Sequence, residues 1–285
     1  MPVTSPRGRQ PSIRVWPMTR VGVLGAGGRM GREVCRAVAA DPDLDLVAAV
    51  DPGHAGEVLA DLTDVEVDLV MARSVDALSE VSAEVAVDFT VAASAVEHLA
   101  WCAGHGVHAV VGTSGITADQ LARAAAAFAD GRANAVVAAN FAVTAVLLMR
   151  FAELAAPFVD GVDIVELHHD TKRDAPSGTA LRTAERLAEA RRRSGRDPWP
   201  GDKTVDVLLT GARGAEGPGG VRIHSVRLPG LVAHQEIIMG AVGQGLTLRH
   251  DAYDRTSFMP GVLLAIKAVG RLPGMTLGLD DVLGL

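Results

Sequence analysis

Over the first half of the chain, short apolar runs alternate with segments in which apolar residues recur every three or four positions. The helical spacing predicts helices over Arg29–Ala40 and Ser94–Gly104 and from near Thr117. The apolar runs predict buried strands over Arg20–Leu24, Leu46–Val50, Val85–Phe89, His108–Val111 and Ala135–Ala138. Strands that alternate with helices are typical of an α/β fold, here a Rossmann-type, doubly wound parallel sheet.

The second half has a different pattern. A long helix is predicted over Val143–Ala156, a buried strand ends near Leu167, and further helices are predicted over Ala180–Arg193 and Met259–Val269. Apolar runs between Gly-rich turns predict strands over Val205–Leu209, Val221–Arg227, His234–Gly240 and Leu246–Asp251. Consecutive strands predict a second, α+β domain with a mainly antiparallel open sheet. Its apolar face, as at residues 237–239, must be covered, and self-association is the natural cover.

Composition excludes several classes of protein. The chain has 285 residues, 48% of them hydrophobic, and a formal net charge of −7, which argues against nucleic acid as a partner. Aromatic residues make up 4%, too few for base-stacking surfaces. Cys35 and Cys102 form no disulfide framework, which fits a reducing cytoplasm. No run of about 18 apolar residues predicts a membrane span.

A glycine-rich turn joins the first predicted strand to the first helix. Glycines at 25, 27, 28 and 31 allow a tight reversal and let a pyrophosphate approach the helix N-terminus. Asp51, at the tip of the next strand, suits the adenosine ribose hydroxyls of NAD, whereas Arg29 could pair with the 2′-phosphate of NADP. Residues 52–82 are interpreted as connecting structure near the adenine. The alternative is a turn that only packs helix on strand.

Two further loops follow predicted strands of the first domain. Gly112–Gly115 lies where open parallel sheets bind ligands, at the carboxyl end of a strand. Asn140 leaves the next strand and could bond the nicotinamide amide, although a turn asparagine is an equally good interpretation. His98, His105 and His108 are interpreted as helix-surface or loop residues without a role.

The stretch Glu166–Thr179 (Glu-Leu-His-His-Asp-Thr-Lys-Arg-Asp-Ala-Pro-Ser-Gly-Thr) carries the most specific chemistry. It predicts a strand, a polar loop and a helix whose cap is Asp174, Ser177 or Thr179. The amide-rich start of that helix suits a carboxylate or phosphate, and the loop adds two imidazoles and an ammonium, so it suits an anionic substrate that exchanges a proton. Alternatives are a structural His-His pair or a zinc site, for which no third ligand stands at a recognisable spacing.

The chain resembles the 4-hydroxy-tetrahydrodipicolinate reductase (dihydrodipicolinate reductase) family from about Thr19 to its C-terminus. The resemblance rests on Glu166–Ala180, Val21–Gly31, Gly112–Gly115, Ala138–Phe141 and Arg255–Phe258. It implies that His168 is the proton donor/acceptor, that Lys172 is the proton donor, and that His169, Gly178 and Thr179 hold substrate carboxylates. It implies cofactor contacts at Gly25, Ala26, Gly27, Gly28, Arg29, Met30, Asp51, Gly112, Thr113, Ser114, Ala138, Ala139, Asn140 and Phe141. The family usually has threonine where Ser114 stands, and the hydroxyl is retained.

The resemblance also implies the reaction, which is an NADH- or NADPH-dependent reduction in lysine and diaminopimelate synthesis. Hydride goes to C4 of the cyclic dicarboxylate and a proton to C3, with loss of water, and no metal takes part. The implied assembly is a homotetramer built on the second sheet. Alternatives are another nicotinamide dehydrogenase of an amino-acid-derived anion, of the aspartate or homoserine type, or a cofactor-binding regulator without catalysis.

Taken together, these predictions divide the chain. Residues 18–139 with 252–285 form a dinucleotide-binding domain, and residues 140–251 form a domain for substrate binding and oligomerisation. Residues 1–17 contain arginines, serines and prolines but no acidic residue. They are interpreted as a disordered tail or as the product of an upstream start codon with Met18 as the first residue; a transit peptide is the alternative.

Overall fold

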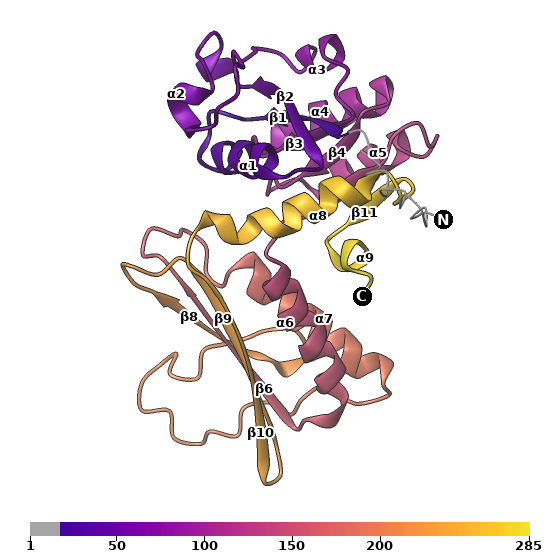
Figure 1. Cartoon of the computed structure of the whole chain (residues 1–285). Helices are drawn as coiled ribbons and strands as arrows, with labels where there is room; N and C mark the ends of the chain where they lie inside the picture. Colours follow the sequence, from indigo (N-terminus) through magenta and orange to yellow (C-terminus); the bar gives the residue numbers. More distant parts are fainter. Residues whose placement is uncertain (1–17) are drawn as a thin grey trace, which may run out of the picture.

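The structure is a computed structural model that describes residues 18–285. The predictions for residues 1–17 lie outside the described residues. The chain forms two lobes, an upper one built on a parallel sheet and a lower one in which two long helices lie against a second sheet (Figure 1). Residues 18–285 contain no helix that is long and apolar enough to cross a membrane.

The first sheet has six strands, all parallel, in the order β11-β5-β4-β3-β1-β2. Because both faces are covered, these strands are mostly apolar, as the sequence predicted. The predicted α/β fold with a doubly wound sheet is therefore confirmed. The strand bounds are β1 (Thr19–Leu24), β2 (Leu44–Val50), β3 (Val85–Asp88), β4 (His108–Val111), β5 (Ala135–Val137) and β11 (Met275–Leu277).

Helices pack on both faces of this sheet. The buried sides of α1 (Arg29–Ala40) and α8 (Met259–Val269) cover one face. The buried sides of α4 (Ala92–His105) and α5 (Ala118–Ala127) cover the other. Residues 52–82 are irregular and hold only three short helices, which are η1 (Pro52–His54), α2 (Ala60–Thr63) and α3 (Ala77–Glu80).

The second sheet is mixed and follows the order β10-β9-β6-β8-β7. Three of its four neighbouring pairs are antiparallel, as predicted, but β6 and β8 are parallel. The reason is that α7 crosses between them and returns the chain in the same direction. The bounds are β6 (Gly161–His168), α7 (Gly178–Arg193), β7 (Ala215–Glu216), η3 (Pro218–Gly220), β8 (Arg222–Arg227), β9 (Ala233–Ala241) and β10 (Gln244–Ala252).

The strand predicted over Val205–Leu209 is wrong. Residues 201–207 have no regular structure, and turns follow. The side chain of Val205 is 91% exposed and that of Leu208 is 96% exposed. An apolar run predicts a strand only where a neighbouring strand and a core receive it, and this segment lies outside the five strands of the sheet.

One face of the second sheet is covered by helices of the same chain. The helices α6 (Val143–Ala155) and α7 pack on it, followed after α6 by η2 (Ala156–Phe158). Ile237 and Met239 are fully buried in this core. The prediction that self-association covers the apolar face at residues 237–239 is therefore wrong for these two side chains, whereas Ile238 points the other way and is 43% exposed.

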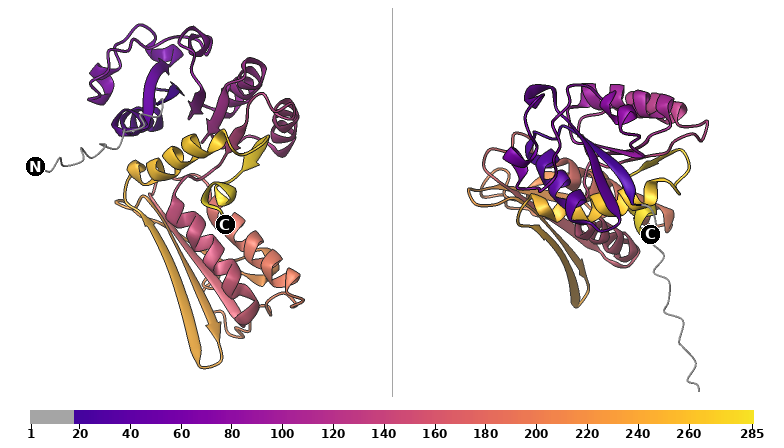
Figure 2. Two further views of the ribbon diagram at one scale, coloured as in Figure 1. Left: turned by 45° about the vertical axis from the view of Figure 1, so that its right-hand side comes forward. Right: turned by 45° about the horizontal axis from the view of Figure 1, so that its top comes forward.

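The C-terminal segment returns to the first lobe. After η4 (Arg255–Phe258), α8 packs against α1 and β4, and β11 pairs with β5 at the edge of the parallel sheet. The last helix, α9 (Asp280–Leu283), lies beside α7 of the second lobe, and both views in Figure 2 show α8 between the lobes. The three-residue strand β11 gave no recognisable sequence signal.

Candidate active site

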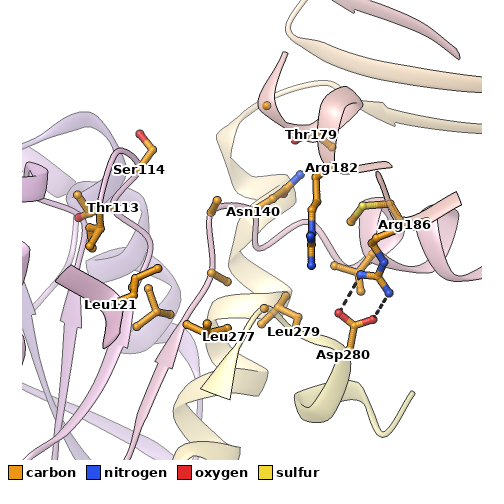
Figure 3. Close-up of a pocket in the computed structure, with 18 of the residues that line it drawn as sticks. Thr113, Ser114, Leu121, Asn140, Thr179, Arg182, Arg186, Leu277, Leu279 and Asp280 are labelled. Atoms are coloured by element: carbon orange, nitrogen blue, oxygen red, sulfur yellow. Dashed lines mark hydrogen bonds and ion pairs between the residues drawn. The ribbon is translucent and has the colours of Figure 1, made fainter. Parts of the chain in front are cut away.

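A cavity of about 450 Å³ lies between the lobes (Figure 3). On the first lobe it is lined by Thr113 and Ser114, which follow β4, and by the segment Ala138–Asn140, which follows β5. On the second lobe it is lined by the start of α7 and by residues further along that helix, namely Gly178, Thr179, Arg182 and Arg186. The structure thus brings two of the predicted cofactor loops and two predicted substrate residues to one cavity.

A second cavity, of about 660 Å³, lies over the glycine-rich turn. Gly25, Gly28 and Asp51 line it. Gly25 has φ +79°, a left-handed conformation that favours glycine, and Gly28 is the exposed N-cap of α1. Since no side chain stands at either position, a phosphate can reach the backbone at the start of α1. These residues fit the pyrophosphate of a dinucleotide.

Phe89 lies between the two cavities. Its ring lines the second cavity and packs against Phe141, with the ring centroids 5.8 Å apart. A side chain at Gly112 would meet the same ring, and Thr113, the next residue, lines the first cavity. The two cavities are therefore neighbours along the carboxyl edge of one sheet, as an extended dinucleotide requires.

The buried carboxylate of Asp88 connects the loop that follows β3 with the loop that follows β4. Asp88 ends β3 and accepts hydrogen bonds from the hydroxyls of Thr90 (2.6 Å) and Thr113 (3.3 Å). It also contacts Nδ1 of His98 at 2.6 Å, and His98 lines the second cavity. The interpretation of His98 as a surface residue without a role missed this contact, which only the fold reveals.

The other residues predicted to contact the cofactor differ in how far their side chains are exposed. Arg29 is exposed and Met30 is partly exposed, whereas the side chain of Phe141 is buried. Ala26 is fully buried, so it can offer only its backbone. Asp51 accepts hydrogen bonds from the N–H groups of Gly27 (3.0 Å) and Gly53 (2.9 Å), which orient its carboxylate in the cavity wall.

Asn140 fits both interpretations that the sequence left open. Its Oδ1 accepts a hydrogen bond from the N–H of Ala142 at 2.8 Å, which is the geometry of a turn asparagine. The residue also lines the cavity, and Figure 3 shows its amide nitrogen directed toward the second lobe, near Arg182.

The first turn of α7 presents backbone N–H groups to the cavity from the second lobe. Ser177 is the N-cap, and its Oγ accepts from the N–H of Ala180 at 3.1 Å. This cap leaves the N–H groups of Gly178 and Thr179, which have no acceptor within the helix, at the wall of the cavity. A carboxylate there would also gain from the helix dipole.

The histidines and Lys172 lie beside this turn but not in the lining of the cavity. His168 is the last residue of β6 and is half-buried. Nζ of Lys172 donates to both carboxylate oxygens of Asp174, at 2.7 and 3.0 Å, and this hydrogen bond holds the pKa of Asp174 below its usual range. His169 is exposed, with Nδ1 2.7 Å from the hydroxyl of Thr171.

Two residues next to His168 were missed by the sequence analysis. Glu166 is fully buried and contacts Nδ1 of His168 at 2.6 Å. Arg227, at the end of β8, donates to both oxygens of Glu166 at 2.9 and 2.7 Å. The alternation Ile164, Glu166, His168 already placed the last two on one face of a strand, but the sequence carried no signal for the pairing with Arg227.

Among residues 18–285, no group of three or more His, Cys, Asp or Glu side chains is placed so that it could hold a metal ion.

Arg186 joins three elements at the floor of the cavity. It pairs with Glu153 of α6 through Nε and with Asp280 of α9 through both Nη atoms, at 3.1 and 2.6 Å. The hydrogen bond with Asp280 is the main reason that the pKa of Arg186 is raised, and it lowers the pKa of Asp280. The C-terminal helix is thereby fixed to the helix that begins at Gly178.

We expect Arg186→Leu to lower the free energy of unfolding by about 2–4 kcal/mol, because it leaves the buried Glu153 with Arg150 as its one ion-pair partner in the described part of the chain. The midpoint of urea unfolding measures this loss. Arg182→Leu is the matched control on the same helix. Among residues 18–285, Arg182 pairs only with the exposed Glu185, so its loss is expected to stay within about 0.5 kcal/mol. Equal losses in the two variants would contradict this account.

A parallel sheet with a glycine-rich turn at its carboxyl edge, whose neighbouring loops face the start of a helix across a cavity, is typical of a class of protein, the two-domain nicotinamide-dependent oxidoreductases. Comparison with known proteins gives the family. The family model for the N-terminus of dihydrodipicolinate reductase matches residues 19–141, and the model for its C-terminus matches residues 144–283. The chain belongs to the dihydrodipicolinate reductase family, so it is an NADH- or NADPH-dependent oxidoreductase, and the predicted resemblance is confirmed.

Individual relatives agree. The chain is 48% identical over 267 residues to the 4-hydroxy-tetrahydrodipicolinate reductase of Nocardia farcinica, covering 93% of this chain and 99% of the relative. It is 46% identical, with the same coverage, to that of Corynebacterium aurimucosum. Among solved structures it resembles a dipicolinate-bound dihydrodipicolinate reductase from Paenisporosarcina sp., with a TM-score of 0.80, 38% identity and coverage of 93% of this chain and 99% of that one.

Proposed function

We propose that this protein reduces 4-hydroxy-tetrahydrodipicolinate to tetrahydrodipicolinate in lysine and diaminopimelate synthesis, with the roles of the individual residues as set out below. The observation that carries these roles is the shared cavity, since Gly178 and Thr179 of one lobe line it together with Thr113 and Ser114 of the other. Family membership removes the reason for preferring an aspartate- or homoserine-type dehydrogenase or a regulator without catalysis.

The first lobe holds the cofactor. The pyrophosphate lies at the start of α1, over Gly25–Met30, and Asp51 receives the adenosine ribose. Gly112–Ser114 and Ala138–Phe141 hold the nicotinamide end, with Phe141 contributing through its backbone, since its side chain is buried. The bound cofactor supplies the hydride that is delivered to C4 of the substrate.

The second lobe binds and protonates the substrate. The N–H groups at the start of α7, on Gly178 and Thr179, receive one carboxylate, and His169 contributes to binding the carboxylates. The 4-hydroxyl leaves as water together with one hydrogen of C3, and the double bond formed by this loss then receives hydride at C4 and a proton at C3. Lys172 donates a proton in this sequence, and His168 donates or accepts one. Asp174 keeps the ammonium of Lys172 beside the turn.

These roles require the lobes to approach each other. His168 and Lys172 lie next to the cavity rather than in its lining, while Ser177, which donates to Glu166 at 3.3 Å, directly precedes the residues that do line it. The lobes close when a few residues that connect them change their φ and ψ angles, and this hinge motion completes the site. This proposal gives residues 18–139 with 252–285 to the cofactor and residues 140–251 to the substrate.

The same proposal includes the assembly and the compartment. A homotetramer forms through the face of the second sheet that the helices leave open, where Ile238 is half-exposed. The protein acts in the cytoplasm, which suits two buried free thiols, Cys35 and Cys102.

A steady-state assay tests the reaction and the cofactor preference together. Freshly prepared product of dihydrodipicolinate synthase is mixed with the protein and either NADH or NADPH, and absorbance at the nicotinamide band is followed. We expect substrate-dependent oxidation of at least one cofactor and no reduction of NAD by aspartate. Oxidation of neither cofactor, or reduction of NAD with aspartate as the substrate, would overturn the proposal.

A further inference from the structure

We propose that Glu166 and Arg227 act as a positioning pair for His168, in which Glu166 fixes the tautomer of the imidazole and Arg227 balances the charge of Glu166. The proposal rests on the function given above, because it assigns to His168 the exchange of a proton with the substrate. It adds two residues for which neither the sequence nor the comparisons suggest a role.

The geometry fixes one nitrogen of the ring. Nδ1 of His168 lies 2.6 Å from Oε2 of Glu166. An ionised carboxylate only accepts hydrogen bonds, so Nδ1 must carry the proton of this contact. Nε2 is then the atom that gains and loses a proton, as in sites where a carboxylate orients a catalytic imidazole.

Both carboxylate oxygens of Glu166 accept hydrogen bonds from neighbouring residues. The two Nη atoms of Arg227 donate to its two oxygens, and the N–H of Ser177 donates to Oε1 at 3.3 Å. Arg227 also donates to the carbonyl of Asp174 at 2.8 Å, so the pair ties the ends of β6 and β8 to the loop that carries Lys172. The imidazole therefore has a rigid support made of two strands and a loop.

Stability alone is a weak reason for this pair. A buried ion pair gains little net free energy, because both charges lose their water. Arg227 moreover has a buried Nε without a hydrogen-bond partner among the described residues. The pair instead lies beside His168, so that one negative and one positive charge act on the imidazole ring.

The two charges act on His168 in opposite directions. Burial lowers the pKa of His168 most, the hydrogen bond and charge of Glu166 raise it, and the charges of Lys172 and Arg227 lower it again. Burial raises the pKa of Glu166, but hydrogen bonds from Arg227, Ser225 and His168 outweigh this and leave it below the usual value. Glu166 therefore stays ionised and its charge is largely compensated.

The residues that β9 and α7 place near the ring of His168 add no charge that would reverse these effects on its pKa. The strand β9 places Ala233 and Gln235 opposite His168 and Glu166, and neither is ionisable. The helix α7 begins with Gly178 and Thr179, which carry no charge. On the loop, the negative charge of Asp174 is engaged by Lys172.

The test is a proton-nitrogen NMR titration of protein labelled with ¹⁵N-histidine, with the signal of His168 assigned by its loss in His168→Asn. We expect the neutral ring of His168 in the unmodified protein to carry its proton on Nδ1. We expect its pKa to fall in Glu166→Gln, which removes the anion, and to rise in Arg227→Met, which removes a cation. Turnover in Glu166→Gln is expected to fall about 10–100-fold, the range for losing an orienting partner, with the KM for the cofactor unchanged.

Glu236→Gln is the matched control, because it removes a carboxylate paired with an arginine, Arg249, from the same sheet. It is expected to leave both the pKa and turnover unchanged. Should Glu166→Gln fail to fold, the neutral double variant Glu166→Gln with Arg227→Met replaces it, and the pKa of His168 is expected to be lower in the double variant than in Arg227→Met alone. A proton on Nε2 in the unmodified protein, or shifts no larger than in the control, would overturn the proposal.

The same samples separate this proposal from the proposed function. If His168→Asn retains full turnover, the function of His168 is wrong, whatever the titration shows. If His168→Asn loses turnover while the titration shows no coupling to Glu166 or Arg227, only the positioning pair is wrong.

Discussion

Replacing Lys172 with alanine is expected to lower turnover about 10²–10⁴-fold, the contribution that a positioned proton donor makes to the transition state. His168→Ala is expected to fall in the same range. In both variants the KM for the nicotinamide cofactor should stay within about twofold, because neither side chain lies in the dinucleotide cradle. A loss confined to turnover identifies an interaction that is made in the transition state.

Steady-state rates at saturating cofactor and substrate measure this effect. Arg173→Ala is the matched control, since it removes the neighbouring cation from the same loop, where Arg173 is exposed. The control is expected to retain turnover. Near-normal turnover in both Lys172→Ala and His168→Ala would refute the assignment of the site, and equal losses in Arg173→Ala would reduce it to a general effect of positive charge.

Replacing Gly31 with alanine is expected to disable cofactor binding. The added Cβ would overlap the carbonyl oxygen of Gly25 and lie 2.8 Å from Cα of Ala26, so the backbone of the glycine-rich turn itself must move. We expect the KM for the cofactor to rise roughly tenfold or more, since 1.4 kcal/mol of lost binding is tenfold. Overpacking at this contact should also cost about 1–3 kcal/mol of stability.

Gly104→Ala is the control for this prediction. Gly104 lies within α4, and a Cβ there meets nothing within 4 Å. Alanine in a helix is favoured over glycine by about 1 kcal/mol, so this variant should be slightly more stable and should bind the cofactor normally. Binding measured by quenching of protein or nicotinamide fluorescence distinguishes the two variants. Unchanged cofactor affinity in Gly31→Ala would show that the turn does not need its close approach to α1.

The nucleotide-binding half was predictable because its elements depend on local pattern. The helix Arg29–Ala40 and the strand His108–Val111 were predicted with the bounds that the structure has. The central strands are buried on both faces, so their apolar runs carry a strong signal. A strand of three residues at the sheet edge, Met275–Leu277, carries too little pattern to be recognised.

The second half was less predictable because its pairing depends on distant segments. The run Val205–Leu209 has the composition of a strand, yet the sheet offers it no partner. The parallel pairing of β6 with β8 required recognising that α7 is a crossover helix. For the same reason the contact between Glu166 and Arg227, which are 61 residues apart, had no sequence signal.

The sequence indicated the separate motifs of the candidate site but not how they lie relative to one another. The polar loop after β6 and the glycine-rich turn were found as motifs, because each depends on residues close in sequence. Their juxtaposition depends on α7 lying opposite the loops after β4 and β5, which is a property of the fold. Arg182, which is exposed, and Arg186, which is mostly buried, complete the cavity from α7, and nothing in the sequence of a helix marks such arginines as part of a site.

A crystal structure of the protein with NADH and dipicolinate would show whether the two lobes together form one active site. We expect the nicotinamide ring beside Thr113 and Asn140, a dicarboxylate bound to the N–H groups of Gly178 and Thr179, and His168 and Lys172 within hydrogen-bond reach of that ligand. A dicarboxylate bound away from the start of α7, or His168 and Lys172 still separated from it with both ligands in place, would contradict the account.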